Sequence, residues 1–268
     1  MLGLTSSMSR YFLSIEFDGA SFSGWQIQPD APTVEGAIEE ALGLLFQQPM
    51  DIIGQGRTDA GVHAKAQVAH IDISPDDWHR FRKTTANHPE EDQSLLCHRL
   101  NRLLGPTIYI STIREVKDDA HARFDALSRS YLYRILTEPS PLRTHQSWNA
   151  GGHWNLEVLN ELAGQIVGEH DFDSLSKTNP ENYTTLCKIE ESRWFIEGDE
   201  IFYKVTANRF LRNMVRRLVG TMWYMQDENI VTSNTISWIH DRKDHQIYTA
   251  PAHALCLVGV QYPSEIFI

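Results

Sequence analysis

The stretch MDIIGQGRTDAGVHAKAQVAHIDI, residues 50–73, places a polar, glycine-rich loop between two apolar runs. The runs MDIIG and AQVAHIDI predict the two arms of a long β-hairpin. Between them, residues 54–64 carry three glycines together with Arg57 and Asp59, a composition too polar for a protein core. We therefore expect a loop mounted between rigid strands, where functional residues are commonly held.

Hydrophobic periodicity outside this loop predicts a mixture of strands and helices. Alternation predicts strands over 11–17 and 128–138, a hairpin around Glu197–Asp199 and a buried strand from 255 onward. Helical spacing predicts helices capped by Thr33 and Asn155, a helix from Trp78 to Leu104 with an acidic insertion at about 84–93, and a helix over 208–225. The two successive sets of elements predict an α+β chain with two domains, 1–108 and 109–268.

Charge is unevenly distributed along a chain whose formal net charge is -11. Residues 204–217 contain five basic side chains and no acidic one, and residues 122–134 carry a net charge of +2. We therefore expect one basic face and an acidic back, so the overall charge does not exclude a nucleic-acid partner. On the predicted helix, Arg209, Arg212 and Arg216 follow i, i+3, i+7 spacing and would share one flank.

Composition also narrows the setting of the protein. Cys97, Cys187 and Cys256 are isolated, which favours neither a disulfide framework nor a zinc site. No apolar run approaches the roughly 18 residues that a membrane-spanning helix needs. We expect a cytoplasmic protein with no membrane partner.

Asp59 is the first candidate for chemistry, although an aspartate in a tight turn is often only an Asx-turn residue. The adjacent Arg57 and the loop glycines, which would let a large substrate approach, favour a functional role. Asp59 and His63 could instead bind a metal, but no third ligand has suitable spacing. For Tyr131 and Tyr133 the sequence leaves two interpretations open, core aromatics or platforms for stacking an unpaired base.

Four segments in chain order resemble the successive motifs of the tRNA pseudouridine synthase A family. They are GRTDAGVHA (56–64), ARFDALSRSYLYRI (122–135), ANRFLRNMVRRLVG (207–220) and TAPAHALCLVGVQYP (249–263). The segment RYFLSIEFDGASFSGWQIQPDAPTVEGAIEEAL near the N-terminus is similar to this family as well. The likeness covers nearly the whole chain.

This resemblance implies a homodimeric enzyme built from two ferredoxin-like α/β-sandwich domains, whose antiparallel sheets flank a central basic cleft. It implies isomerisation of uridine to pseudouridine at positions 38, 39 and 40 of the tRNA anticodon stem-loop, without a metal or an organic cofactor. Leu175, Ala254 and Cys256 depart from the family pattern, which puts the shape of the pocket wall in doubt. The insertion at 84–93 could alter which part of the tRNA is contacted.

Site residues follow from the resemblance position by position. Asp59 corresponds to the nucleophile, Arg57 to the arginine of the same loop, and Arg216 to an arginine that we expect to keep Asp59 charged. Tyr131 corresponds to the tyrosine that would stack on a flipped-out base, and Leu255 to a leucine of the pocket wall. We further expect Arg209 and Arg212 to bind phosphates. Two other functions stay open, an RNA-binding protein without turnover and a metal-dependent hydrolase using Asp59 and His63.

Overall fold

The computed structural model describes residues 8–84, 91–175, 184–228, 230, 234–240 and 248–268. The chain divides into two compact units, one formed by Met1–Leu127 with Val260–Ile268 and the other by Ser128–Gly259. The sequence-based boundary between residues 108 and 109 falls at the first residue of strand β4 (Ile108–Val116), which pairs with β1 of the first unit. Both units combine helices with mostly antiparallel strands, so the chain has a mixed α/β fold, as expected.

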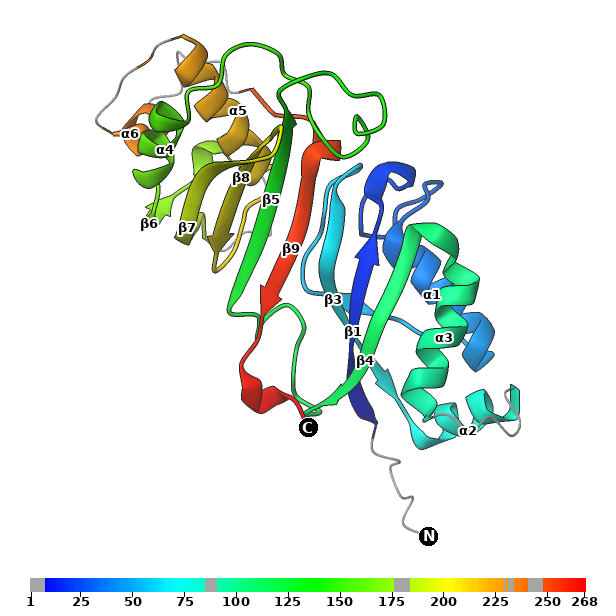
Figure 1. Ribbon diagram of the computed structural model, residues 1–268. Helices are drawn as coiled ribbons and strands as arrows, with labels where there is room; N and C mark the ends of the chain where they lie inside the picture. Colours follow the sequence, from blue (N-terminus) through cyan, green and yellow to red (C-terminus); the bar gives the residue numbers. More distant parts are fainter. Residues whose placement is uncertain (1–7, 85–90, 176–183, 229, 231–233, 241–247) are drawn as a thin grey trace. The chain divides into compact units, whose positions relative to one another are not determined.

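The first unit is built on an antiparallel sheet with strand order β4–β1–β3 (Figure 1). The short strand β2 pairs with β3. The remaining bounds are β1 (Ser9–Phe17), β2 (Ile53–Gly54) and β3 (His63–Ile73). In β1 the side chains of Leu13 and Ile15 are almost fully buried. The predicted strand over 11–17 and the predicted pairing of the two runs around the loop are therefore confirmed.

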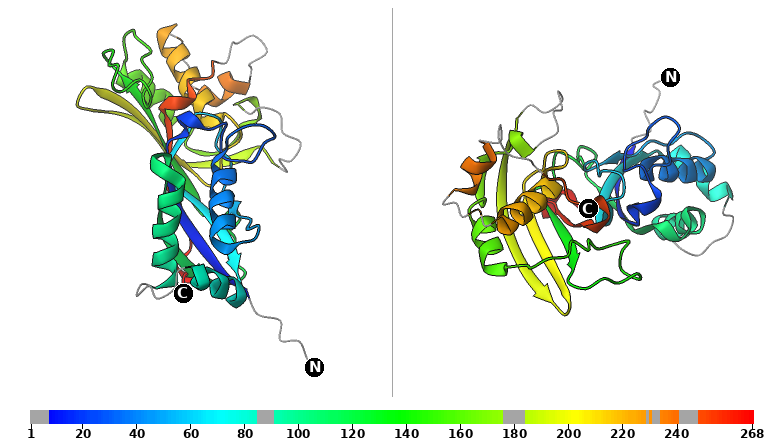
Figure 2. Two further views of the ribbon diagram at one scale, coloured as in Figure 1. Left: turned by 90° about the vertical axis from the view of Figure 1, so that its right-hand side faces the viewer. Right: turned by 90° about the horizontal axis from the view of Figure 1, so that it is seen from above.

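Helices α1 (Val34–Phe46) and α3 (Asp92–Leu104) cover one face of this sheet (Figure 2). Helix α1 begins as the sequence predicts, because the Oγ1 atom of Thr33 accepts a hydrogen bond of 3.3 Å from the Gly36 amide. Such a cap satisfies one of the amides that a helix N-terminus otherwise leaves unbonded.

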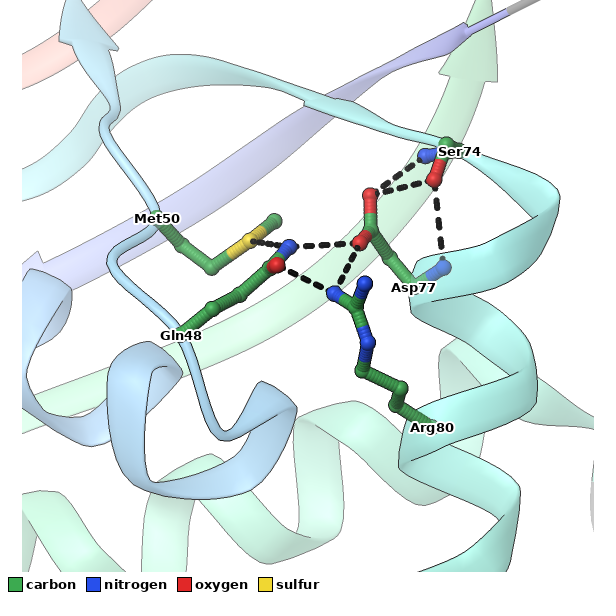
Figure 3. Close-up of polar contacts among 5 residues, drawn as sticks. All are labelled: Gln48, Met50, Ser74, Asp77 and Arg80. Carbon is green, nitrogen blue, oxygen red and sulfur yellow. Dashed lines mark hydrogen bonds and ion pairs between the residues drawn. The ribbon is translucent and has the colours of Figure 1, made fainter. Parts of the chain in front are cut away.

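A polar network fixes the start of helix α2 (Pro75–Thr84), as Figure 3 shows. Ser74 and Asp77 cap each other: the Ser74 amide donates to Asp77 Oδ2 at 2.9 Å, and the Asp77 amide donates to Ser74 Oγ at 3.1 Å. This reciprocal arrangement is a capping box. Gln48 and Arg80 also donate to the buried Asp77 carboxylate, and this joins the segment after α1 to α2.

The helical segment predicted over 78–104 is two helices, α2 and α3. Most of the acidic insertion at 84–93 lies outside the described residues, and α3 already begins at Asp92.

The second unit contains a sheet with order β9–β5–β8–β7–β6, whose β5–β8, β8–β7 and β7–β6 pairs are antiparallel. Helices of this unit lie over the β6–β8 part of the sheet (Figure 1). Gly198, with φ 63°, turns the predicted hairpin between β7 and β8, which confirms it. The bounds are β5 (Ser128–Leu136), β6 (Gly168–Asp171), β7 (Leu186–Glu197), β8 (Glu200–Ala207), β9 (Leu255–Gln261), α4 (Leu156–Gly164), α5 (Met214–Asp227) and α6 (Thr235–His240).

Helix α5 starts six residues later than the sequence pattern predicts, at Met214 instead of 208. Asn208 is bonded to Lys188 of β7, because its amide donates to the Lys188 carbonyl at 3.1 Å and its Oδ1 atom accepts from the Lys188 amide at 2.9 Å. Asn213 then adopts a left-handed conformation with φ 64° immediately before the helix. Arg209 and Arg212 therefore precede the helix, and the prediction that they share a helical flank with Arg216 is wrong.

Candidate active site

The loop over residues 54–64 is held at its base by main-chain and buried side-chain contacts within the first unit. The Gln55 amide donates to the Val68 carbonyl at 2.8 Å, and the buried Gln67 side chain donates to the Gly56 carbonyl at 3.1 Å. The Trp25 amide donates to the Thr58 carbonyl at 3.2 Å. These contacts fix the backbone on both sides of Arg57.

Asp59 occupies the first position of a tight turn. The Val62 amide donates to the Asp59 carbonyl at 3.1 Å, and Gly61 in the third position has φ 79°. A type II turn requires a positive φ at that position, which glycine adopts without strain. The backbone carbonyl of Asp59 therefore closes the turn. Asp59 is partly exposed and Arg57 is exposed.

Different features of the structure account for the three loop glycines. A Cβ atom on Gly54 would lie 2.5 Å from Nε1 of the buried Trp25, so this glycine is required by internal packing. Gly61 is required by its backbone conformation. A Cβ atom on Gly56 would meet no described atom within 4 Å. Packing accounts for Gly54 and backbone conformation accounts for Gly61, so the prediction that the glycines make room for a substrate stays a prediction for Gly56 alone.

His63 is buried at the start of β3, beyond the turn. Its Nδ1 atom lies 3.1 Å from the Gly19 amide nitrogen and 3.0 Å from Oδ1 of Asp18. Among the described residues there is no group of three or more His, Cys, Asp and Glu side chains that could hold a metal ion. His63 thus has a structural role in anchoring the loop to the segment after β1.

In the second unit, Arg216 is part of the first turn of α5 and is attached to the segment before β9. Its Nε donates to the Ala250 carbonyl at 2.7 Å, and the Ala250 amide donates to the Arg216 carbonyl at 3.1 Å. One Nη atom donates to Oδ1 of Asn213 at 3.1 Å. The Ala250 carbonyl and the Asn213 side chain thus orient the partly buried guanidinium, and the Ala250 amide also binds the Arg216 backbone.

Tyr131 is half-buried on β5, and its ring contacts Phe210 edge-to-face with centroids 5.2 Å apart. Tyr133, two residues later, is fully buried. Of the two interpretations that the sequence allowed, Tyr133 is therefore a core aromatic. Leu255 is the first residue of β9 and is 5% exposed.

The predicted basic stretch 204–217 presents fewer unneutralised charges than the sequence suggests. Lys204 forms an ion pair of 2.7 Å with Glu191 on the neighbouring strand β7. Arg209 is half-buried near the buried Cys187, and Arg212 is exposed. Burial raises the pKa of the Cys187 thiol to about 11, and the positive charge of Arg209 opposes that rise.

Comparisons with known proteins bear on the function of the residues described above. The family model described as tRNA pseudouridine synthase matches residues 162–263. A protein of Parabacteroides distasonis called tRNA pseudouridine synthase A is 39% identical over 261 residues, which cover 97% of this chain and 98% of the relative. The chain belongs to the tRNA pseudouridine synthase A family.

Further members of the tRNA pseudouridine synthase A family show similar agreement. The relative from Porphyromonas gingivalis is 38% identical over 97% of this chain and 100% of its own length. The relative from Chlorobaculum tepidum is 40% identical over 78% of this chain and 80% of its own length. Pseudouridine synthases are isomerases, which places the chain in that class of enzyme. No helix among the described residues is both long and apolar enough to cross a membrane.

The motifs shared with the tRNA pseudouridine synthase A family did not reveal the residues that hold Arg216 in place. Asn213 and Ala250 accept hydrogen bonds from the Arg216 side chain. Tyr133 donates a hydrogen bond of 2.9 Å to the carbonyl of Pro251, the residue after Ala250. Thr58, the residue before Asp59 in the sequence, has a buried hydroxyl oxygen. An alternating strand pattern could locate Tyr133 on a buried face, but it contains no signal for a partner 118 residues away.

Proposed function

We propose that this protein isomerises uridine to pseudouridine in tRNA, at positions 38, 39 and 40 of the anticodon stem-loop, with Asp59 as nucleophile. The observation that carries the proposal is the backbone-fixed turn that presents Asp59 beside the exposed Arg57 and the open side of Gly56. Family membership supports the substrate, because the relatives are called tRNA pseudouridine synthases. A carboxylate held on a rigid turn has the pre-organisation that a nucleophile needs.

The reaction is redox-neutral and requires no electron carrier. The bond between C1′ of the ribose and N1 of uracil breaks, the base turns, and a bond forms between C1′ and C5. The hydrogen on C5 leaves as a proton and N1 gains one, so the product is an isomer of the substrate. The proposed task of the enzyme is to supply an ionised nucleophile and to hold the detached base while it turns.

A uridine stacked in an RNA stem must leave the stack before Asp59 can reach it. In our proposal Arg57 occupies the vacated space or holds the displaced phosphates, and Tyr131 stacks on the flipped base. Such stacking contributes about 1–3 kcal/mol per base. Leu255 would line the apolar side of the pocket.

Arginines of the second unit complete the proposal. Arg216 would keep the Asp59 carboxylate charged, since a nearby guanidinium favours the ionised form. Arg209 and Arg212 would bind phosphates, although from the segment before α5 and not from its flank. The basic cleft between two ferredoxin-like units, the homodimer and the cytoplasmic location, all implied by the family resemblance, are part of the same proposal.

An Asp59→Asn variant tests the nucleophile, because the amide keeps the size of the side chain and lacks its charge. We expect this variant to bind a tRNA anticodon stem-loop and to form no pseudouridine, measured by pseudouridine mapping of the RNA and by a binding assay. Asp51→Asn is the matched control, since Asp51 is an exposed carboxylate of the same unit, and it should keep full activity. Turnover by the Asp59 variant would contradict the assignment.

The same assay separates the two alternative functions. An RNA-binding protein without turnover would bind the stem-loop and leave every uridine unchanged, even in its wild-type form. A metal-dependent hydrolase using Asp59 and His63 would lose its activity when a chelator is added. The proposed isomerase retains its activity in the presence of the chelator.

A further inference from the structure

Tyr133 joins a buried strand to the segment that holds Arg216. It lies on β5 with a fully buried side chain, and its hydroxyl donates to the Pro251 carbonyl at 2.9 Å. Pro251 directly follows Ala250, whose carbonyl accepts the Arg216 Nε–H at 2.7 Å. One buried hydroxyl is therefore separated from the Arg216 guanidinium by two hydrogen bonds and a short piece of backbone.

Other contacts show that residues 248–251 are fixed by packing as well as by this bond. A Cβ atom on Gly220 of α5 would lie 2.1 Å from the Tyr248 carbonyl oxygen, so helix and segment are in direct contact. The Tyr248 ring stacks on Trp148 with centroids 5.9 Å apart and contacts Trp223 at 5.5 Å. The Tyr133 hydroxyl adds to this packing a hydrogen bond to the carbonyl of Pro251, the residue after Ala250.

The Tyr133 hydroxyl keeps its proton at neutral pH and can donate a hydrogen bond. Burial raises the pKa of Tyr133 well above its usual range, and the positive charge of Arg216 only partly opposes that rise. A neutral phenol keeps its proton and donates a hydrogen bond to the Pro251 carbonyl. The bond therefore gives a constant reference position to the segment.

We propose that Tyr133 is a positioning residue for Arg216, acting through the Pro251–Ala250 backbone on the guanidinium that the proposed function places beside Asp59. The inference rests on that function for the role of Arg216. It assigns to Tyr133 no contact with the RNA, because its side chain is fully buried. Without the hydroxyl, the backbone at Pro251 and Ala250 should become more mobile. The Arg216 guanidinium, which is bonded to the Ala250 carbonyl, should then adopt other orientations.

Tyr133→Phe removes the hydroxyl and keeps the ring, and the second unit offers a matched control. Tyr203 pairs with Tyr133 in the register of β5 and β8, is also fully buried, and has a hydroxyl hydrogen-bonded to Ser192 at 2.9 Å. We expect Tyr133→Phe to lower the single-turnover rate of pseudouridine formation about 10- to 100-fold, with an unchanged Kd for tRNA. Tyr203→Phe should retain the wild-type rate. Equal rates in the two variants would overturn the inference.

A double-mutant cycle with Arg216→Lys shows whether the effect passes through Arg216. In the Arg216→Lys background, Tyr133→Phe should cause no further fall in rate, whereas independent, multiplicative losses would overturn the inference. The Nε–H signal of Arg216 in 15N NMR spectra gives a readout that does not depend on turnover. It should shift in Tyr133→Phe and stay in place in Tyr203→Phe, and an unmoved signal in both would also overturn the inference.

Failure of the proposed function is a separate outcome of these experiments. Turnover by Asp59→Asn would overturn the nucleophile and leave the rate and NMR comparison of Tyr133→Phe with Tyr203→Phe unaffected. Independent losses in the cycle would remove the role of Tyr133 and leave the nucleophile in place.

Discussion

Thr58 lies between Arg57 and Asp59, and its hydroxyl oxygen is buried without a hydrogen-bond partner among the described residues. A buried polar atom that loses its bonds to water on folding, and gains none in return, lowers the free energy of unfolding by about 1–3 kcal/mol. Such atoms are rare in folded proteins. Thr33, also buried in the first unit, has a satisfied hydroxyl that caps α1.

Thr58→Val should therefore raise the free energy of unfolding, by about 1 kcal/mol, since it keeps the shape of the side chain and removes the unbonded oxygen. Thr33→Val should lower it by about 1 kcal/mol, because the cap is lost. Urea unfolding of the two variants and the wild type measures both changes. Destabilisation of similar size in both variants would show that Thr58 is bonded in solution.

At the scale of single elements, the capping box at the start of α2 depends on Asp77. Asp77→Ala removes the acceptor of the Ser74 amide and leaves Gln48 and Arg80 without their shared carboxylate. We expect a loss of about 2 kcal/mol in the free energy of unfolding. Asp76→Ala, which removes an exposed acid from the same turn, should cost less than about 0.5 kcal/mol. Urea unfolding compares them, and equal losses would contradict the capping role.

Elements governed by neighbouring residues could be predicted from the sequence, as the caps of α1 and α4 illustrate. Thr33 bonds Gly36, and Asn155 bonds the amides of Glu157 and Val158, so each cap depends on three or four adjacent positions. The start of α5 was predicted wrongly because Asn208 is bonded to Lys188, 20 residues earlier in the chain. Helical spacing alone contains no information about that partner.

The same limit applies to the candidate site. The loop carrying Asp59 could be recognised because its glycines, Arg57 and Asp59 are contiguous in the sequence. The sequence could not show why each glycine is needed, because Gly54 is required by its contact with the Trp25 ring, which is distant in the chain. The support of Arg216 by Ala250, 34 residues later, depends on tertiary structure in the same way.

At the scale of the whole molecule, a chain with a net charge of -11 is proposed to bind a polyanion. Binding should then depend on a few local cations, and affinity for tRNA should fall steeply with salt as counterions are released. Arg209→Ala and Arg212→Ala should each reduce the slope of log K against log salt concentration by about one. Lys204→Ala should leave the slope unchanged, because Lys204 is paired with Glu191. Equal slopes in all three variants would contradict phosphate binding by these arginines.

The most direct test of the central claim, that Asp59 is the nucleophile of uridine isomerisation in the anticodon stem-loop, is pseudouridine mapping in total tRNA. Cells that lack this protein would be complemented with the wild type or with Asp59→Asn, expressed at equal levels. The expected result is that uridines at positions 38–40 remain unmodified in the deletion strain and are converted only by the wild type. Restoration by Asp59→Asn, or unchanged modification in the deletion strain, would contradict the claim.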